Sequence, residues 1–169
     1  MKKQSLFILF LMLTMFACEK DDICSEATAT TPQLVIRFYD ALIPEDTKSI
    51  SGLFVYGIND ADETVFFKNI TIGTKDSIAI PLRTDSNMTK LVFHKDLVDT
   101  DDLLVGNPDT VDVSYERKDI YVSRACGYKA TFTNLGAVLT PDADNWIINI
   151  TIENNTIDNE NAAHINIYH

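Results

Sequence analysis

The stretch that decides the fold covers residues 33–40 and reads QLVIRFYD. Leu34, Ile36 and Phe38 occupy every second position, and Arg37 lies between two of them. Side chains two residues apart lie on the same face of a strand, so this spacing predicts a β-strand with one buried face.

The same period of two continues outward from this stretch to the end of the chain, and no segment keeps a helical period over ten residues. Strands are expected at residues 33–40, 50–58, 64–72, 76–82, 89–94, 109–115, 120–133, 146–153 and 163–168. A hairpin turn is expected at residues 116–119, and a short helical turn within residues 93–104. The pattern predicts an all-β domain at residues 33–169, an antiparallel β-sandwich of immunoglobulin-like type with eight or nine strands.

The strand expected at residues 120–133 has a predicted inward face that includes Tyr128 as a core aromatic residue. The full inward set is Ile120, Val122, Cys126, Tyr128 and Phe132.

Length and charge exclude several classes of protein. The chain has 169 residues and a net charge of −11, and removing Lys2 and Lys3 with an N-terminal signal would take the charge to −13. A field of this sign repels phosphate backbones, so we expect no nucleic-acid partner. The length is that of one domain.

The N-terminus predicts export. Lys2 and Lys3 precede the apolar run 6–16, whose eleven residues would span about 16 Å as a helix, roughly half of a bilayer core. Residues 1–17 are therefore predicted to be a signal peptide and not a membrane span.

The residues that end this run, Met15-Phe16-Ala17-Cys18, resemble the lipobox of bacterial lipoproteins. The resemblance implies cleavage before Cys18 and attachment of acyl chains (diacylglycerol and an amide-linked chain such as palmitate) to that residue, which together anchor a protein firmly. Met15 and the bulky Phe16 depart from the usual lipobox, a looseness that resembles Bacteroidota lipoproteins. The alternative is an ordinary cleavage site followed by a free cysteine.

The next residues, Cys18-Glu19-Lys20-Asp21-Asp22, resemble the signal that sends Bacteroidota lipoproteins across the outer membrane. The resemblance implies a lipid-anchored protein of the outer membrane that faces the cell exterior, and a periplasm-facing anchor is the alternative. Residues 18–32 then form a small, polar tether that ends at Pro32.

Two cysteines remain once Cys18 is set aside. Cys24 lies on the tether and Cys126 in a predicted strand, and an even pair in an exported protein predicts a disulfide. Two unpaired thiols are the alternative.

Catalytic and metal-binding patterns are weak. His94, His164 and His169 are scattered, and neither a nucleophile elbow nor a phosphate loop occurs. The acidic segments 96–102 and 142–145 lack the spacing of a calcium loop. We therefore expect no catalytic residues, no metal and no cofactor.

Three functions stay open. The first is a non-catalytic module at the cell surface that binds a protein or serves envelope structure, and the second is a glycan-binding module of a polysaccharide-uptake system. The third is a hydrolase, because two of the abundant carboxyl groups could form the acid pair that glycoside hydrolysis needs. The aromatic residues that a glycan could contact are Tyr39, Tyr56, Phe66, Trp146 and Tyr168.

Two tripeptides, Asp76-Ser77-Ile78 and Asp109-Thr110-Val111, resemble the pattern at which Bacteroidota O-glycosylate exported proteins. The resemblance implies glycans on Ser77 and Thr110. The stretch 121–130, with 33–40 and 163–168, resembles a family of small uncharacterised lipoproteins of Flavobacteria and related Bacteroidota. That resemblance implies the same location and adds no activity.

Overall fold

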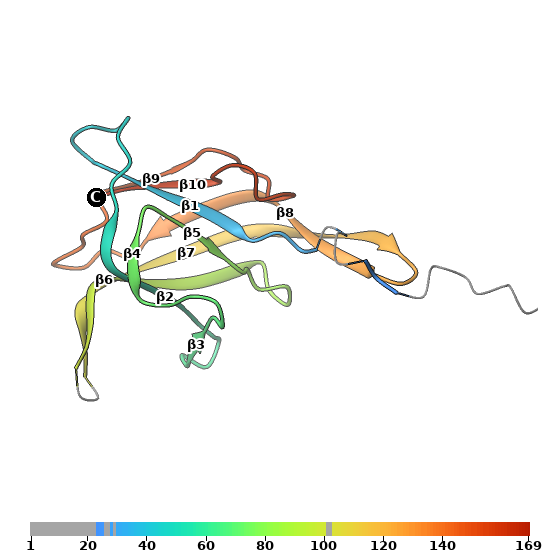
Figure 1. The fold of residues 1–169 in the computed structure, drawn as a ribbon, viewed down its shortest axis with the longest axis horizontal. Coiled ribbons are helices and arrows are strands. Elements are labelled where there is room, and N and C mark those ends of the chain that lie inside the picture. The colour runs from blue at the N-terminus through green and yellow to red at the C-terminus, as the bar shows by residue number, and fades with distance from the viewer. Residues whose placement is uncertain (1–22, 26–27, 29, 101–102) are drawn as a thin grey trace, which may run out of the picture.

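The computed structural model describes residues 23–25, 28, 30–100 and 103–169 (Figure 1). The predicted signal peptide at residues 1–17 and the predicted lipidation site, Cys18, lie outside the described residues. Within those residues no helix is long and apolar enough to cross a membrane.

The described part of the chain is all-β and contains ten strands. They are β1 (Leu34–Tyr39), β2 (Ile50–Ile58), β3 (Thr64–Phe66), β4 (Gly73–Lys75), β5 (Ser77–Ile80), β6 (Met88–Thr100), β7 (Leu103–Ser123), β8 (Gly127–Leu139), β9 (Asn149–Ile152) and β10 (Ile165–Tyr168). Nine of them correspond to the expected strands, with changed ends. The additional one is β4, which lies between the strands expected at residues 64–72 and 76–82.

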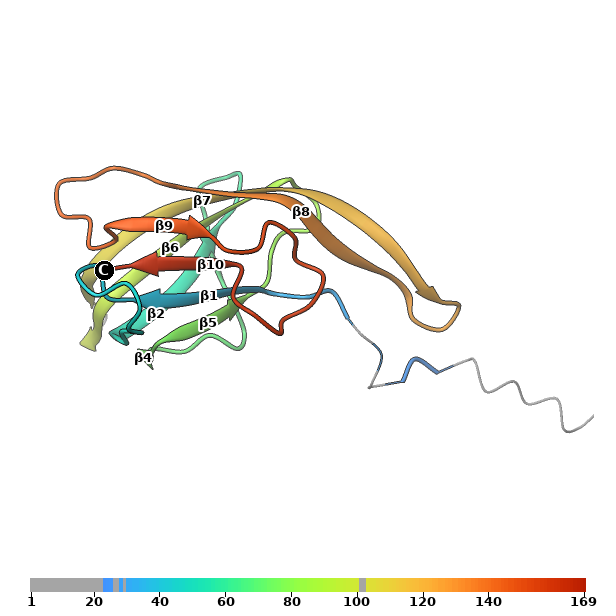
Figure 2. The same ribbon diagram turned by 90° about the horizontal axis from the view of Figure 1, so that it is seen from above.

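The strands form two sheets, which Figures 1 and 2 show as two layers. The smaller sheet has the order β5-β1-β10-β9, and its first and last strands in the chain, β1 and β10, pair in parallel. The larger sheet has the order β3-β2-β6-β7-β8, and β4 also pairs with β2. All other pairings between the described strands are antiparallel.

An apolar core lies between the sheets, and the period-two pattern explains it. Leu34, Ile36 and Phe38 of β1 are buried, as expected, and they belong to one cluster with Phe93 of β6 and Phe132 of β8. Removal of these side chains from water is the main force that holds the two layers together.

The expected hairpin turn at residues 116–119 is wrong, because β7 runs straight through it. Arg117 and Asp119 lie two apart on one strand face and pair at 2.6 Å, so their charges are satisfied within the strand. The chain turns instead between Ser123 and Gly127, which has a φ of +69°. Such a backbone conformation favours glycine.

The helical turn expected within residues 93–104 is also wrong. β6 and β7 continue there as a hairpin, and their register shifts between Lys95 and Val98. The shift is a β-bulge in which Asp96 takes a φ of +53°. The acidic residues described in this segment therefore follow strands and not a helix.

The inward face predicted for residues 120–133 is correct only near the body of the domain. Phe132 is fully buried, whereas Ile120 and Tyr128 are 39% and 70% exposed. The outer parts of β7 and β8 project beyond the two layers as an extension (Figures 1 and 2), so neither of the described sheets packs over them. We call residues 120–129 the β7–β8 arm.

Candidate functional site

The structure joins Cys24 to Cys126, the pairing that the sequence predicts. The two Cα atoms lie 4.8 Å apart, and the bond spans 102 residues of sequence. Cys126 lies at the tip of the β7–β8 arm, where its N–H donates to Ser123 Oγ at 3.0 Å. The disulfide therefore fastens the N-terminal tether to the tip of the arm.

The two candidate O-glycosylation sites differ in accessibility. Ser77 is exposed at the start of β5, where its hydroxyl donates to Asp76 at 3.0 Å. Thr110 is half-buried within β7, and the preceding Asp109 is fully buried. Burial raises the pKa of Asp109, whose carboxylate accepts the Ile147 N–H at 2.8 Å. Modification of both hydroxyls stays a prediction, and Ser77 is the more accessible.

The three histidines are buried in separate places, and burial lowers the pKa of each. His164 accepts the Val35 N–H at 3.0 Å, and the His169 ring contacts the Lys48 carbonyl at 3.1 Å. Among the described residues no group of three or more His, Cys, Asp or Glu side chains could hold a metal ion.

The aromatic residues considered for glycan contact fall into two pairs and one buried residue. Tyr56 and Phe66 lie with ring centroids 6.0 Å apart, and Tyr39 and Tyr168 lie 5.7 Å apart. Trp146 is only 8% exposed and packs inside. Phe66 is 64% exposed and offers the most open ring of the five.

The acidic segment 142–145 forms a local turn. Asn145 accepts the Asp142 N–H at 2.8 Å, and Asp142 accepts the Asp144 N–H at 3.1 Å. These side chains satisfy their own backbone, which is what short polar residues do in turns.

A cavity of about 330 Å³ lies beside the β2–β3 hairpin. It is lined by Gly57, Ile58, Asn59, Val65, Phe67, Pro81, Leu82, Arg83, Asp85 and Thr89. Half of these are apolar side chains, and a few polar groups converge at one side. This volume and this lining are typical of sites for small ligands.

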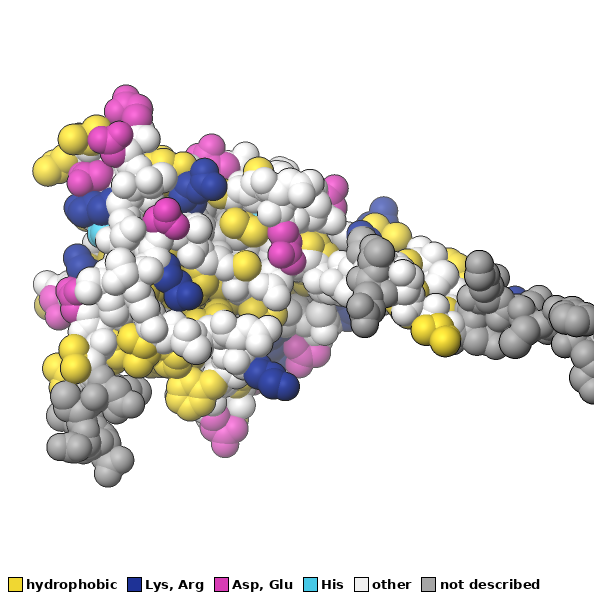
Figure 3. Space-filling model, in the orientation of Figure 1, with side chains coloured by type: hydrophobic (Ala, Val, Ile, Leu, Met, Phe, Trp, Pro, Cys, Tyr) yellow, Lys and Arg dark blue, Asp and Glu magenta, His cyan; other side chains and the backbone are white. Residues whose placement is uncertain are grey.

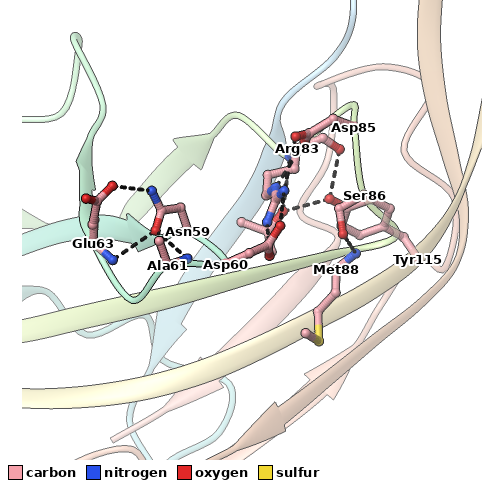
Figure 4. Close-up of polar contacts among 10 residues, drawn as sticks. Asn59, Asp60, Ala61, Glu63, Arg83, Asp85, Ser86, Met88 and Tyr115 are labelled. Atoms are coloured by element: carbon pink, nitrogen blue, oxygen red, sulfur yellow. Dashed lines mark hydrogen bonds and ion pairs between the residues drawn. The ribbon is translucent and has the colours of Figure 1, made fainter.

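Arg83 is one of the polar residues that line this cavity, and Figure 4 shows how its guanidinium is held. It makes two hydrogen bonds to Asp60, at 2.6 and 2.9 Å, and two to Asp85, both at 3.0 Å. The Arg83 hydrogen bonds hold the pKa of Asp60 and of Asp85 below the usual value, and the carboxylates in turn raise the pKa of Arg83. All three groups stay charged near neutral pH, with a net charge of −1.

The Arg83 backbone is fixed as firmly as its side chain. Its N–H donates to Thr89 Oγ1 at 3.0 Å, and its carbonyl accepts from the Tyr115 hydroxyl at 2.8 Å. The Thr89 and Tyr115 hydroxyls lie 2.7 Å apart, and burial raises the pKa of Tyr115. A side chain held from both ends is preorganised for recognition.

The other side of the cavity is set by the β2–β3 turn, which Asn59 stabilises (Figure 4). Its Oδ1 accepts the N–H groups of Ala61 and Glu63, both at 2.9 Å, and its Nδ2 donates to the Glu63 carboxylate at 2.9 Å. These bonds fix the turn that carries Asp60 towards Arg83.

The sequence pattern did not single out Asp60, Arg83 or Asp85. The signal that was present is an arginine directly after the strand expected at residues 76–82. Asp60 lies 23 residues away from Arg83, so the cluster exists only once the fold brings β2 beside the β5–β6 loop.

A family model described as "Family of unknown function (DUF6452)" matches residues 52–169. Neither a curated protein nor a solved structure matches the chain.

Proposed function

We propose a function for this chain, which belongs to the family of unknown function DUF6452, from the residues of the chain itself. The protein is a non-catalytic lipoprotein of the outer membrane, anchored through Cys18 and facing the cell exterior. It captures a ligand at the cell surface in the cavity beside Arg83. The observation that carries the ligand site is the open apolar cavity with its fixed polar side.

The charges beside the cavity support binding and not catalysis. A general acid needs a carboxyl group whose pKa is raised towards neutrality. Asp60 and Asp85 have lowered pKa values because both bind Arg83. The cavity is therefore suited to an apolar group that carries a hydrogen-bonding head, such as a side chain of a protein partner.

Indole is a suitable probe for the cavity, because it combines an apolar ring with one N–H donor. We expect indole to shift the NMR signals of Val65, Leu82 and Arg83, which line the cavity. Val65→Trp should fill the opening and weaken indole binding by about tenfold or more, which corresponds to about 1.4 kcal/mol.

Val138→Trp is the matched control, because Val138 is also an exposed strand valine and lies outside the cavity lining. It should leave indole binding unchanged. Indole that binds both variants equally well would show that the cavity is not a ligand site.

The anchor is tested at Cys18. Cys18→Ser should leave an uncleaved or soluble chain, because lipid transfer needs the thiol and cleavage follows lipidation. The domain should fold normally, since its strands begin at Leu34. Membrane fractionation of wild type and variant checks this, and a variant that is still cleaved and membrane-bound would refute lipidation at Cys18.

A glycan-binding module is the second candidate function, favoured by the exposed ring of Phe66. Phe54 and Tyr56 lie beside that ring, each with a centroid distance of 6.0 Å. Sugar rings stack on such exposed aromatic faces. Polysaccharide binding that Phe66→Ala abolishes and Val65→Trp spares would favour this candidate over the cavity.

The sandwich of immunoglobulin-like type also stands as a proposal. It is supported by the two layers around one core and by the parallel pairing of β1 with β10.

A further inference from the structure

The β7–β8 arm exposes aromatic and apolar side chains that the proposed ligand site does not use. Tyr121 and Tyr128 are 58% and 70% exposed and face each other across the two strands, with ring centroids 5.4 Å apart. Ile120 adds a third exposed apolar side chain on the same arm. A tyrosine side chain combines an apolar ring with a polar hydroxyl, and such side chains are typical of membrane–water interfaces.

The charge of the arm is opposite to that of the whole protein. Residues 120–129 contain Arg124 and Lys129 and no acidic residue, whereas the chain carries a net charge of −11. The arm extends to the right in Figure 3, where separate hydrophobic side chains are visible along it. Basic residues beside interfacial aromatics complement the phosphates of lipid headgroups.

The disulfide sets how far the arm can lie from the predicted anchor. Cys18 precedes Cys24 by six residues, and six extended residues reach at most about 20 Å. Without the bond, the first described hydrogen bond from the tether to a strand would be at Thr31, thirteen residues after Cys18. The Cys24–Cys126 bond thus brings the attachment point from the domain body to the arm tip.

The tether also follows the arm towards the domain. Thr31 Oγ1 accepts the Ala130 N–H at 3.0 Å, which joins this part of the tether to β8. Thr28, Thr30 and Thr31 line a hollow together with Tyr128 and Lys129. The arm and the tether therefore leave the domain on the same side.

We propose that the β7–β8 arm is a membrane-contacting element, which rests Tyr121 and Tyr128 in the headgroup layer while Arg124 and Lys129 meet lipid phosphates. This inference rests on the proposed anchoring at Cys18. The occupant is a phospholipid surface, because the short span from Cys18 to Cys24 and the positive charge of the arm both favour it. The contact holds the domain in one orientation on the membrane.

Tyrosine NMR tests the arm in the lipidated, mature protein. The chain has six tyrosines, which can all be replaced with 3-fluorotyrosine and assigned with Tyr→Phe variants. The protein is reconstituted in vesicles of phosphatidylethanolamine and phosphatidylglycerol that contain a headgroup nitroxide lipid. We expect loss of the Tyr121 and Tyr128 signals, while those of Tyr39, Tyr56 and Tyr168 persist.

Two variants separate the causes of that loss. Arg124→Gln with Lys129→Gln should restore part of the Tyr121 and Tyr128 signals, because the phosphate contacts are removed. Cys24→Ser with Cys126→Ser should restore them as well, because the arm is released from the anchor.

The outcomes distinguish the two proposals. A chain that does not fractionate with the vesicles overturns both the anchor and the arm contact. An anchored chain whose six tyrosine signals are equally affected, or not affected, overturns only the arm contact. Changes at Tyr121 and Tyr128 that depend on protein concentration without lipid would show a contact between copies instead, which also overturns it.

Discussion

Replacing Cys24 and Cys126 with serine is expected to lower the free energy of unfolding by up to about 4.7 kcal/mol, the value for a closed loop of about one hundred residues in the chain-entropy model. The bond closes a span of 102 residues, which includes most of the strands. The unfolded chain therefore loses much of its freedom when the bond is present. Urea unfolding of the double variant, followed by circular dichroism, measures the difference.

Wild-type protein in a reducing agent is the control, because it lacks the bond but keeps both sulfur atoms. Its unfolding midpoint should match that of the double variant. An oxidised wild type that unfolds at the same urea concentration as the reduced protein would contradict the prediction. It would show that the bond fixes the tether without a net stabilisation of the folded domain.

Strand positions were predictable wherever one face of a strand is buried. In β1 the spacing of Leu34, Ile36 and Phe38 indicates both the strand and its inward face. Every second side chain of a strand lies on the same face, and the face that carries the apolar side chains is the buried one. The same reasoning fails on the β7–β8 arm. Ile120 and Tyr128 belong to the alternating set expected to face inward, although both side chains are exposed. Periodicity predicts a strand, but it does not predict whether a second layer covers the apolar face of that strand.

Turns were less predictable than strands. Charges such as those at residues 116–119 are common in turns, but charged side chains are equally stable on a strand that water reaches from both faces. The actual turn lies between Ser123 and Gly127, and Gly127 has a positive φ. Glycine at such a position is the stronger signal, because side chains rarely tolerate that conformation.

The candidate site also has one part that was predictable from the sequence and one part that was not. The Cys24–Cys126 pair was predictable, since setting Cys18 aside as the predicted lipidation site leaves each of the other two cysteines one partner. The cluster of Asp60, Arg83 and Asp85 was not, because an acidic chain offers many carboxylates to any arginine. Which ones meet depends on the register that places the β2–β3 turn beside the β5–β6 loop.

Gly52→Ala is expected to lower the free energy of unfolding by about 2 to 5 kcal/mol, from two separate costs. Gly52 has a φ of +57°, and an L-residue in that conformation costs about 1–2 kcal/mol. Its added Cβ would also lie 2.6 Å from the Leu97 backbone N and 2.9 Å from the Asp96 backbone C. Overpacking against backbone that cannot move aside costs about 1–3 kcal/mol more.

Two other glycines separate these costs. Gly127 has a φ of +69°, and a Cβ added there would meet no atom of the described residues within 4 Å, so Gly127→Ala should show the conformational cost alone, about 1–2 kcal/mol. Gly73 meets only the far end of Lys75 at 3.9 Å, so Gly73→Ala should change stability by less than about 0.5 kcal/mol. Chemical unfolding of the three variants gives the ranking. If Gly52→Ala is no more destabilising than Gly127→Ala, the β6 bulge moves aside for the added methyl group and the overpacking cost is absent.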